Sequence, residues 1–233
     1  MVYLIPTLLD ADAQDTLPES ITHAVKKCSI FFVENERSAR RFLKKIWNEM
    51  VIDDYQWVLA DRKTVYEPLA RQLFTTALRQ GKNIGILSEA GCPGIADPGQ
   101  ELVALAHQQG IAVKPLVGPS SILLALMGSG LNGQTFCFSG YLPIDKEQRA
   151  KKIRELETES ALKKRTQIFM ETPYRNQAML ETLLHTCKKE TLLCVAAGLT
   201  GPEEFILTKR IGEWKQPLPD LHKKPCLFLL LAE

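Results

Sequence analysis

The sequence lacks the features that mark several protein classes. Its longest apolar run near the C-terminal end, residues 226–232, is far shorter than the ~20 residues a membrane-spanning helix needs. No basic segment precedes an apolar core at the N-terminus, as it would in a signal peptide. Its 29 lysines and arginines nearly balance 27 aspartates and glutamates, so any nucleic-acid-binding surface must be a local patch. We therefore expect a cytoplasmic globular protein that does not enter a membrane.

Patterns typical of metal sites and disulfide frameworks are also absent. The six cysteines show no C-x-x-C spacing, and no two of the four histidines stand at ligand spacing. We predict reduced, mostly buried thiols and no metal. Cys92 lies in a glycine-rich segment, where it is either a small apolar filler or an exposed thiol, and we favour the filler.

Two nucleotide-binding motifs are missing too. The chain contains neither G-x-x-x-x-G-K-[ST] nor G-x-G-x-x-G after a strand. This disfavours a nucleotide enzyme that cradles phosphates. It also disfavours the common methyltransferase fold with a glycine-rich first turn.

Apolar runs alternate with helical periodicities along the first half of the chain. We predict strands at 2–5, 29–33, 83–87 and 111–117, a helix starting near residue 18, and helices at 37–47, 65–80 and 97–109. This βαβ order predicts a mostly parallel sheet with right-handed crossovers.

Strands become denser after Val117. They are predicted at 135–139, 166–170, 191–197, 205–211 and 226–231, with helices at 122–127, 145–160 and 174–187. Because some of these strands follow one another directly, we expect a mixed sheet. The predicted domains are residues 1–116 and 117–233, both of the α/β class.

The segment 88–99, Ser-Glu-Ala-Gly-Cys-Pro-Gly-Ile-Ala-Asp-Pro-Gly, is the strongest candidate ligand site. Its glycines let a ligand approach the backbone, and its prolines fix the loop shape. It follows a predicted strand and precedes a helix, and ligands of open α/β sheets bind beyond the carboxyl ends of strands. Asp97 has a second interpretation as a helix N-cap, with Pro98 as first helical residue and Gln100 as reciprocal partner.

Three further loops follow predicted strands. In Gly118-Pro119-Ser120-Ser121, the serines either cap a helix or reach a polar ligand. In Glu171-Thr172-Pro173-Tyr174-Arg175, the glutamate and arginine either bind substrate or pair with each other. Glu34-Asn35-Glu36-Arg37 has the same placement after the second strand. With segment 88–99, these loops predict one cleft lined from several sides.

Basic residues gather in two clusters. The second lies on and after the helix 145–160, where interleaved glutamates favour an ordinary solvated face. The first lies beside a candidate site loop, so contact with phosphate is more plausible there. Its members are Arg37, Arg40, Arg41, Lys44 and Lys45.

These motifs resemble the tetrapyrrole methylase superfamily of S-adenosylmethionine-dependent methyltransferases. Within it, they are most similar to the bacterial ribosomal RNA small subunit methyltransferase I group. Segment 88–99 is similar to the group's S-D-A-G-T-P-G-I-S-D-P-G, and residues 169–175 resemble F-Y-E-S-P-H-R. Further similar segments are 115–121, 129–131, 138–143 and 224–228, so the resemblance covers nearly the whole chain.

The resemblance implies two α/β domains with S-adenosylmethionine in the cleft between them, usually in a homodimer. It also implies an RNA substrate in the small ribosomal subunit, methylated on a cytidine 2′-hydroxyl. Glu34 and Arg37 match the group's A-E-D-T-R segment, which faces the cleft. The cofactor-binding residues implied or matched are Pro6, Ser88, Gly91, Pro93, Gly94, Ile95, Ser120, Ser121, Met170, Tyr174, Ala197, Gly198, Leu199, Pro225 and Cys226.

The chain departs from the group at positions near the substrate. The group's P-I-G-N-L is Pro6-Thr7-Leu8-Leu9-Asp10 here, and the aspartate of A-E-D-T-R is Asn35. A-R-E-L-T has become residues 196–200, Ala-Ala-Gly-Leu-Thr. The group often carries a further C-terminal segment, whereas this sequence ends at Glu233. These differences bear on the methyl acceptor rather than on the cofactor.

Methyl transfer from a sulfonium is an in-line displacement, so the protein must orient the acceptor and help remove a hydroxyl proton. We predict Glu34 as that helper, with Glu89 and Glu171 behind it. Arg37 and Arg175 would hold a phosphate or carboxylate of the substrate. Two alternatives stay open: methyl transfer to a small molecule or protein, and cofactor binding without turnover.

Overall fold

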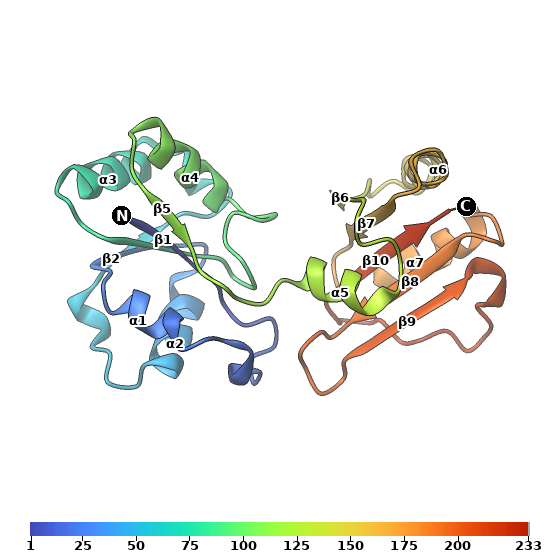
Figure 1. Cartoon of the computed structure of the whole chain (residues 1–233), viewed down its shortest axis with the longest axis horizontal. Coiled ribbons are helices and arrows are strands. Elements are labelled where there is room, and N and C mark those ends of the chain that lie inside the picture. The colour runs from blue at the N-terminus through green and yellow to red at the C-terminus, as the bar shows by residue number, and fades with distance from the viewer. Residues whose placement is uncertain (233) are drawn as a thin grey trace. The chain divides into compact units, whose positions relative to one another are not determined.

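The structure is a computed structural model that describes residues 1–232. They form two compact units, the first covering Met1–Ser120 and the second beginning at Ser121 (Figure 1). None of the helices in this range combines the length and apolar character that a membrane crossing requires.

The first unit is built on a five-stranded parallel sheet of order β3-β2-β4-β1-β5. The strands are β1 (Val2–Ile5), β2 (Ile30–Val33), β3 (Gln56–Leu59), β4 (Ile84–Leu87) and β5 (Val113–Pro115). The parallel sheet predicted from the βαβ order is confirmed. The strand β3 was not predicted, because it is an edge strand in which only Val58 is buried and its sequence therefore shows little apolar pattern.

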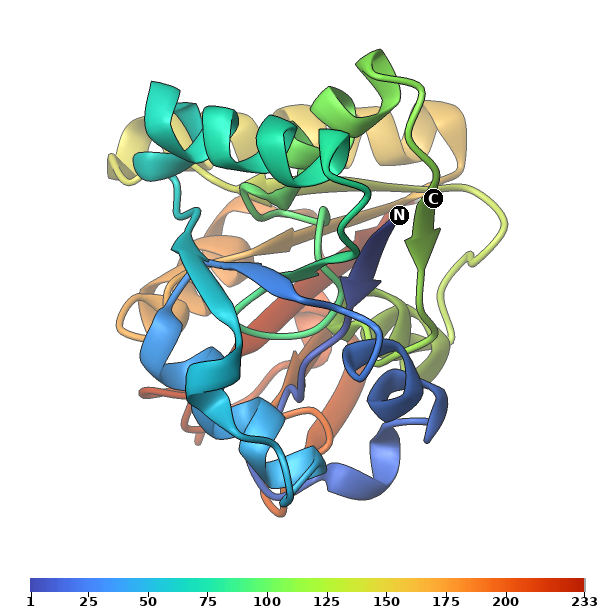
Figure 2. The same ribbon diagram turned by 90° about the vertical axis from the view of Figure 1, so that its left-hand side faces the viewer.

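Helices cover both faces of this sheet. Figures 1 and 2 show α3 and α4 above it and α1 and α2 below it. On the upper face Phe32 meets Phe74 edge to face, with ring centroids 5.1 Å apart; on the lower face Phe31 stacks on Trp57 at 5.1 Å. The helices are α1 (Ser20–Val25), α2 (Glu36–Ile46), α3 (Pro68–Arg79) and α4 (Gly99–Gln108), with short 3-10 turns η1 (Gln14–Thr16), η2 (Ile52–Asp54) and η3 (Thr64–Tyr66).

Three elements predicted in the first unit are shorter in the structure by more than two residues. The helix expected over 65–80 begins only at Pro68, because proline lacks an N–H donor and holds the preceding Glu67 in an extended conformation. The helix expected from Asp97 begins at Gly99. The strand expected over 111–117 is reduced to β5, which lies at the sheet edge and pairs only with β1.

The second unit is built on a mixed sheet of order β6-β7-β10-β8-β9, as predicted. Only the β6–β7 pair is parallel, and β10 runs antiparallel to β7 and β8. Phe169 and Phe228 stack in its core against α6 and α7, while α5 contacts β8, β9 and β10. The elements are α5 (Ser121–Ser129), β6 (Phe136–Tyr141), α6 (Lys146–Lys163), β7 (Thr166–Met170), α7 (Asn176–Thr186), β8 (Leu192–Ala197), β9 (Phe205–Arg210), η4 (Ile211–Glu213) and β10 (Cys226–Leu231).

All six cysteines are free thiols, as predicted. Burial raises the pKa of Cys28 and of Cys187 to about 12, so both are inert at neutral pH. Cys92 is half-buried, and its Sγ lies 3.4 Å from the carbonyl oxygen of Pro119. Its side chain fills space beside the glycine-rich loop, which agrees with the favoured interpretation.

Candidate functional site

The segment 88–99 connects β4 to α4 and has a defined shape. The Thr7 N–H donates to the carbonyl of Gly91 at 2.9 Å, and the Thr7 hydroxyl donates to the carbonyl of Ser88 at 3.3 Å. Gly91 has φ +74°, and a Cβ there would lie 3.2 Å from the carbonyl oxygen of Pro119. The loop is therefore held beside the end of β1 by the two hydrogen bonds from Thr7. Its tight turn needs a glycine at position 91.

Asp97 closes the other end of this loop. Its carboxylate accepts hydrogen bonds from the Gly94 N–H at 2.9 Å and from the Gly99 N–H at 2.7 Å. Gly99 is the first residue of α4, and Pro98 stands at the N-cap position, so the predicted roles of Asp97 as N-cap and Pro98 as first helical residue are wrong by one position. The Asp97 carboxylate instead ties the loop to the start of the helix from the residue before the cap. The exposed Gln100 makes no reciprocal bond in the part of the chain described. Burial raises the pKa of Asp97, against the lowering effect of its two backbone bonds.

Glu34 and Glu89 lie together beside the loop, because β2 and β4 are neighbours in the sheet. The Glu34 Oε2 accepts a hydrogen bond from the Glu89 N–H at 2.8 Å. The Glu89 carboxylate accepts one from the Ser38 hydroxyl. Burial raises the pKa of Glu34, and the charges of Asp97 and Glu89 act in the same direction. The carboxylates of Glu34, Glu89 and Asp97 are therefore close enough at this end of the sheet for their charges to interact.

The helix α2 begins directly after Glu34. Asn35 is its N-cap, and the Asn35 side chain accepts hydrogen bonds from the N–H groups of Arg37 and Ser38. Asparagine caps a helix as well as aspartate does, so this departure from the group's aspartate preserves the local structure. The Arg37 side chain is exposed at the start of the helix.

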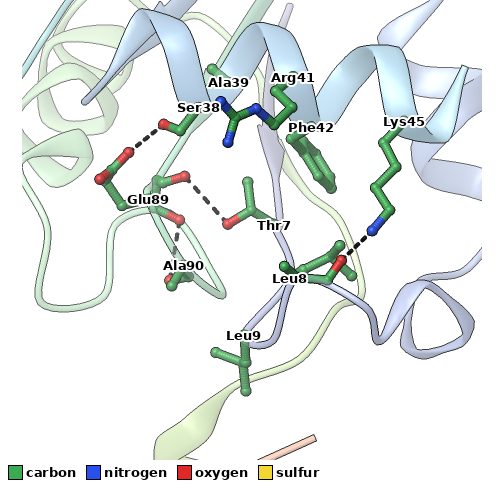
Figure 3. A pocket seen from close by; sticks show the side chains of 12 residues that line it. Thr7, Leu8, Leu9, Ser38, Ala39, Arg41, Phe42, Lys45, Glu89 and Ala90 are labelled. Atoms are coloured by element: carbon green, nitrogen blue, oxygen red, sulfur yellow. Dashed lines mark hydrogen bonds between the residues drawn. The ribbon is translucent and has the colours of Figure 1, made fainter. Parts of the chain in front are cut away.

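A pocket of about 300 Å³ opens between the loop after β1, the helix α2 and the first residues of segment 88–99 (Figure 3). The helix contributes Ser38, Arg41, Phe42 and Lys45, which lie on one face because their spacing is i, i+3, i+4 and i+7. Its lining is Thr7, Leu8, Leu9, Ala11, Ser38, Ala39, Arg41, Phe42, Lys45, Ser88, Glu89 and Ala90.

Only part of this pocket was predicted from the sequence. Arg41 and Lys45 were noticed as members of a basic cluster, whereas Leu8, Leu9 and Phe42 were not considered as site residues. The helical spacing on α2 was a usable signal. No comparable signal marked the two leucines, because nothing local in the sequence indicates that the loop after β1 faces α2.

Glu171 and Arg175 pair with each other in the second unit. The Arg175 Nη2 lies 2.6 Å from the Glu171 Oε1, and the Glu171 side chain is fully buried. The same oxygen accepts a bond from the Thr172 N–H at 2.6 Å. Of the two interpretations offered by the sequence, the structure contains the ion pair. The second oxygen, Oε2, is buried without a hydrogen bond in the described chain.

Most of the residues of the second unit that are implied to bind the cofactor lie at one end of its central strands. Because β10 is antiparallel to both neighbours, its start lies beside the ends of β7 and β8. Cys226 pairs with Ala197, and the Gly198 N–H donates to the carbonyl of Pro225 at 3.0 Å. Met170 ends β7 beside Leu227.

The other residues implied to bind the cofactor lie just after these strands or at the boundary between the two units. Leu199 is buried after β8, whereas Tyr174 is exposed after β7. Ser120 ends the first unit, and Ser121 opens α5. Within residues 1–232, no group of histidine, cysteine or carboxylate side chains is placed to hold a metal ion.

Comparison with known proteins gives consistent matches. The sequence profile of the Tetrapyrrole (Corrin/Porphyrin) Methylases matches residues 13–215. Ribosomal RNA small subunit methyltransferase I of Haemophilus influenzae is 36% identical over 156 residues, which is 66% of this chain and 54% of that protein. The protein of the same name from Micromonospora olivasterospora is 29% identical over 212 residues, 91% of this chain and 63% of its own length. The chain spans about half the length of such relatives.

Solved structures share the fold. A diphthine synthase matches with a TM-score of 0.69 at 16% identity, covering 99% of this chain and 89% of that one. A uroporphyrin-III C-methyltransferase from Thermus thermophilus, solved with S-adenosylhomocysteine, matches with a TM-score of 0.56 at 17% identity, covering 99% and 96%.

The profile match extends over both units, and the solved structures cover nearly the whole chain. The predicted fold of two α/β domains is thereby confirmed, as is the predicted family. This chain belongs to the tetrapyrrole (corrin/porphyrin) methylase family.

Proposed function

We propose that this chain is an S-adenosylmethionine-dependent methyltransferase that acts on a ribose 2′-hydroxyl of small-subunit ribosomal RNA. The observation that carries the proposal is the loop 88–99 at the carboxyl end of β4. Family membership supports methyl transfer, and the names of the relatives support an RNA acceptor. Such a substrate would place the protein in the cytoplasm, and we propose the homodimer implied by the resemblance.

The loop fits the cofactor in two respects. A Cβ at Gly94 would meet no atom within 4 Å, so the backbone is open to a ligand on that side. Glu34, Glu89 and Asp97 surround the start and end of the loop with negative charge, which favours a sulfonium cation. The implied contacts from Ser88, Pro93 and Ile95 belong to the same loop.

In this proposal the bound cofactor supplies an electrophilic methyl group, and the chain positions the acceptor. Glu34 is the carboxylate best suited to accept the hydroxyl proton, since its raised pKa lies nearer to neutral pH than that of an ordinary glutamate. Arg37, exposed at the start of α2, would bind an RNA phosphate. Glu89 is the second candidate base. Glu171 and Arg175, which pair with each other, would position the backbone of the second unit.

Transfer of tritium from labelled S-adenosylmethionine tests the proposal. The purified chain is incubated with small ribosomal subunits from a strain that lacks the gene, and the RNA is digested to nucleosides. We expect label in a 2′-O-methylated nucleoside, and far less with the Glu34→Ala variant. Label in a protein or small-molecule fraction would move the acceptor to that class.

Calorimetry with S-adenosylhomocysteine separates activity from cofactor binding. We expect measurable binding by the folded chain. Binding without transfer to any fraction would indicate a protein that retains the cofactor site but lacks turnover. Absence of binding would contradict the cofactor assignment itself.

A further inference from the structure

We infer that Asn176 is a positioning residue for cofactor binding, because it holds the segment before β10 against the start of α7. Asn176 follows directly after the motif that resembles F-Y-E-S-P-H-R, and it lies outside the set of residues implied to bind the cofactor. The inference rests on the proposed function, since it explains how this chain fixes Pro225 and Cys226, two members of that set.

The Asn176 side chain is buried at the start of α7 and makes one long-range hydrogen bond. The residue is 0% exposed, and its Nδ2 donates to the carbonyl of Lys224 at 2.7 Å. Its Oδ1 is buried without a hydrogen bond in the part of the chain described. An unpaired buried amide oxygen destabilises a fold, and an apolar side chain would avoid that cost. The bond to Lys224 is therefore what this asparagine contributes.

The segment before β10 depends on such bonds for its shape. It lies between η4 and β10 outside any helix or strand, and Lys223 has φ +59°, in the left-handed region. The Lys223 N–H donates to the carbonyl of Pro173 at 3.1 Å. The Leu221 N–H donates to the Gln177 Oε1 at 3.4 Å. Of the three bonds to the region around the start of α7, that of Asn176 is the shortest and the nearest in sequence to β10.

The bond acts one peptide unit before the implied cofactor residues. The Lys224 carbonyl and the Pro225 nitrogen belong to the same planar unit, so fixing the carbonyl oxygen fixes the plane in which Pro225 begins. The ring of Pro225 fixes its own φ, and this carries the orientation forward to Cys226. There the chain enters the sheet, where Cys226 pairs with Ala197 and the Pro225 carbonyl accepts the Gly198 N–H at 3.0 Å.

A ligand that contacts this stretch of backbone depends on the direction of that peptide unit. Without the bond from Asn176, the chain from Lys223 to Pro225 could adopt other orientations in the free protein. Cofactor binding would then have to order it again, at a cost in conformational entropy. The loss of the bond should therefore appear in the affinity for the cofactor as well as in stability.

Calorimetry of the full chain with S-adenosylhomocysteine tests the inference, at a temperature well below every Tm. We expect Asn176→Ala to weaken binding about tenfold, as for the loss of one hydrogen bond. Asn132→Ala is the matched control, because the Asn132 Nδ2 donates to the carbonyl of Lys164 at the same distance, 2.7 Å. Asn132 lies beside the start of β7, whereas Asn176 follows its end. The control should lower the Tm and leave the affinity unchanged.

Asn176→Leu separates positioning from stability. It removes the Nδ2 donor together with the unpaired Oδ1 and fills a similar volume, so the Tm should fall less than in Asn176→Ala. The affinity should fall as far as in Asn176→Ala, because the Lys224 carbonyl loses the same donor. This variant also gives the answer if Asn176→Ala does not fold.

Two results would overturn the inference: an unchanged affinity of Asn176→Leu, or equal weakening of binding by Asn132→Ala. The inference and the proposed function fail in different ways. If the natural protein does not bind S-adenosylhomocysteine, the cofactor assignment fails and the inference fails with it. If the natural protein binds it and methylates RNA, but Asn176→Leu binds it equally well, only the inference fails.

Discussion

The Asp97 carboxylate, in the loop that precedes α4, accepts hydrogen bonds from the N–H groups of Gly94 in the middle of the loop and Gly99 at its end. The sequence was compatible with either a helix cap or a ligand contact at this residue. In the structure Pro98 stands at the N-cap position of α4, and the Asp97 carboxylate bonds Gly99 at the start of the helix and Gly94 inside the loop. The residue therefore organises the loop whether or not it touches a ligand.

Replacing Asp97 by alanine should loosen this loop. We expect a loss of about 1–3 kcal/mol, because two backbone N–H groups lose their carboxylate acceptor, and faster amide exchange at Gly94 and Gly99. Asp61→Ala is a suitable control, because Asp61 accepts similar bonds from the N–H groups of Lys63 and Thr64. An unchanged rate of amide exchange at Gly94 in the Asp97 variant would show that the hydrogen bonds to Asp97 do not hold the loop in shape.

Glu34 should make the stability of the first unit depend on pH. Burial raises its folded pKa above the ordinary value of 4.5. The contribution of Glu34 to the free energy of unfolding is therefore present below about pH 4.5 and is lost as the pH rises through the pKa of the folded state. Glu34→Gln should gain stability relative to the natural protein as the pH rises from 4 to 7, by less than about 1 kcal/mol because the group is half-exposed.

Thermal unfolding at a series of pH values measures this difference. Glu49→Gln, on an exposed position, should follow the natural protein at every pH. A Glu34→Gln variant that loses relative stability toward neutral pH would show that the bond to the Glu89 N–H outweighs the cost of burial.

At the scale of elements, the ends of β1 and β5 meet beside the loop. Gly118 follows β5, and a Cβ there would lie 2.2 Å from the Cβ and 2.5 Å from the Cγ of Pro6. A proline ring cannot swing aside as a flexible side chain can. The close approach of two chain segments therefore requires glycine at this position.

Gly118→Ala should push the two segments apart. Overpacking of this kind costs about 1–3 kcal/mol. We expect a lower Tm and altered NMR signals of Thr7 and Gly91, which depend on the position of β1. Gly133→Ala, where a Cβ meets nothing within 4 Å, should change neither. An unaltered Thr7 signal in the Gly118 variant would mean that the backbone absorbs the methyl group elsewhere.

The elements found from the sequence are those with strong local patterns. Buried strands such as β2 and β4 are continuous apolar runs, and the end of α3 is marked by Gly81 at φ +70°. The edge strand β3 was missed because solvent removes the apolar pattern. The start of α3 was misplaced because the helical periodicity continues through η3, although Pro68 interrupts the backbone.

At the scale of the whole molecule, each unit has its own hydrophobic core. Phe74 is fully buried in the first unit, and Phe228 is fully buried in the second. None of the three core clusters, two in the first unit and one in the second, draws residues from the other unit. A cavity in one core should therefore act mainly on the unit that contains it.

Phe74→Ala should cost about 3–5 kcal/mol and reduce amide protection in the first unit more than in the second. Phe228→Ala should give the opposite distribution, and each variant serves as the control of the other. Hydrogen exchange measured along the chain separates the two patterns. Equal loss of protection in both units for both variants would show that the chain unfolds as one body.

The loop 88–99, the two α/β units and the family could be recognised from the sequence, because glycine spacing, apolar runs and motifs are local properties. The pocket could not be recognised in this way. It needs the strand order β2-β4-β1, which brings residues 7–9, 38–45 and 88–90 together, and that order arises from backbone pairing between distant strands. The i, i+4 spacing of Glu171 and Arg175 in the sequence likewise did not decide whether they pair with each other or bind substrate. It forms because the Glu171 side chain is buried, and a buried carboxylate needs its partner close at hand.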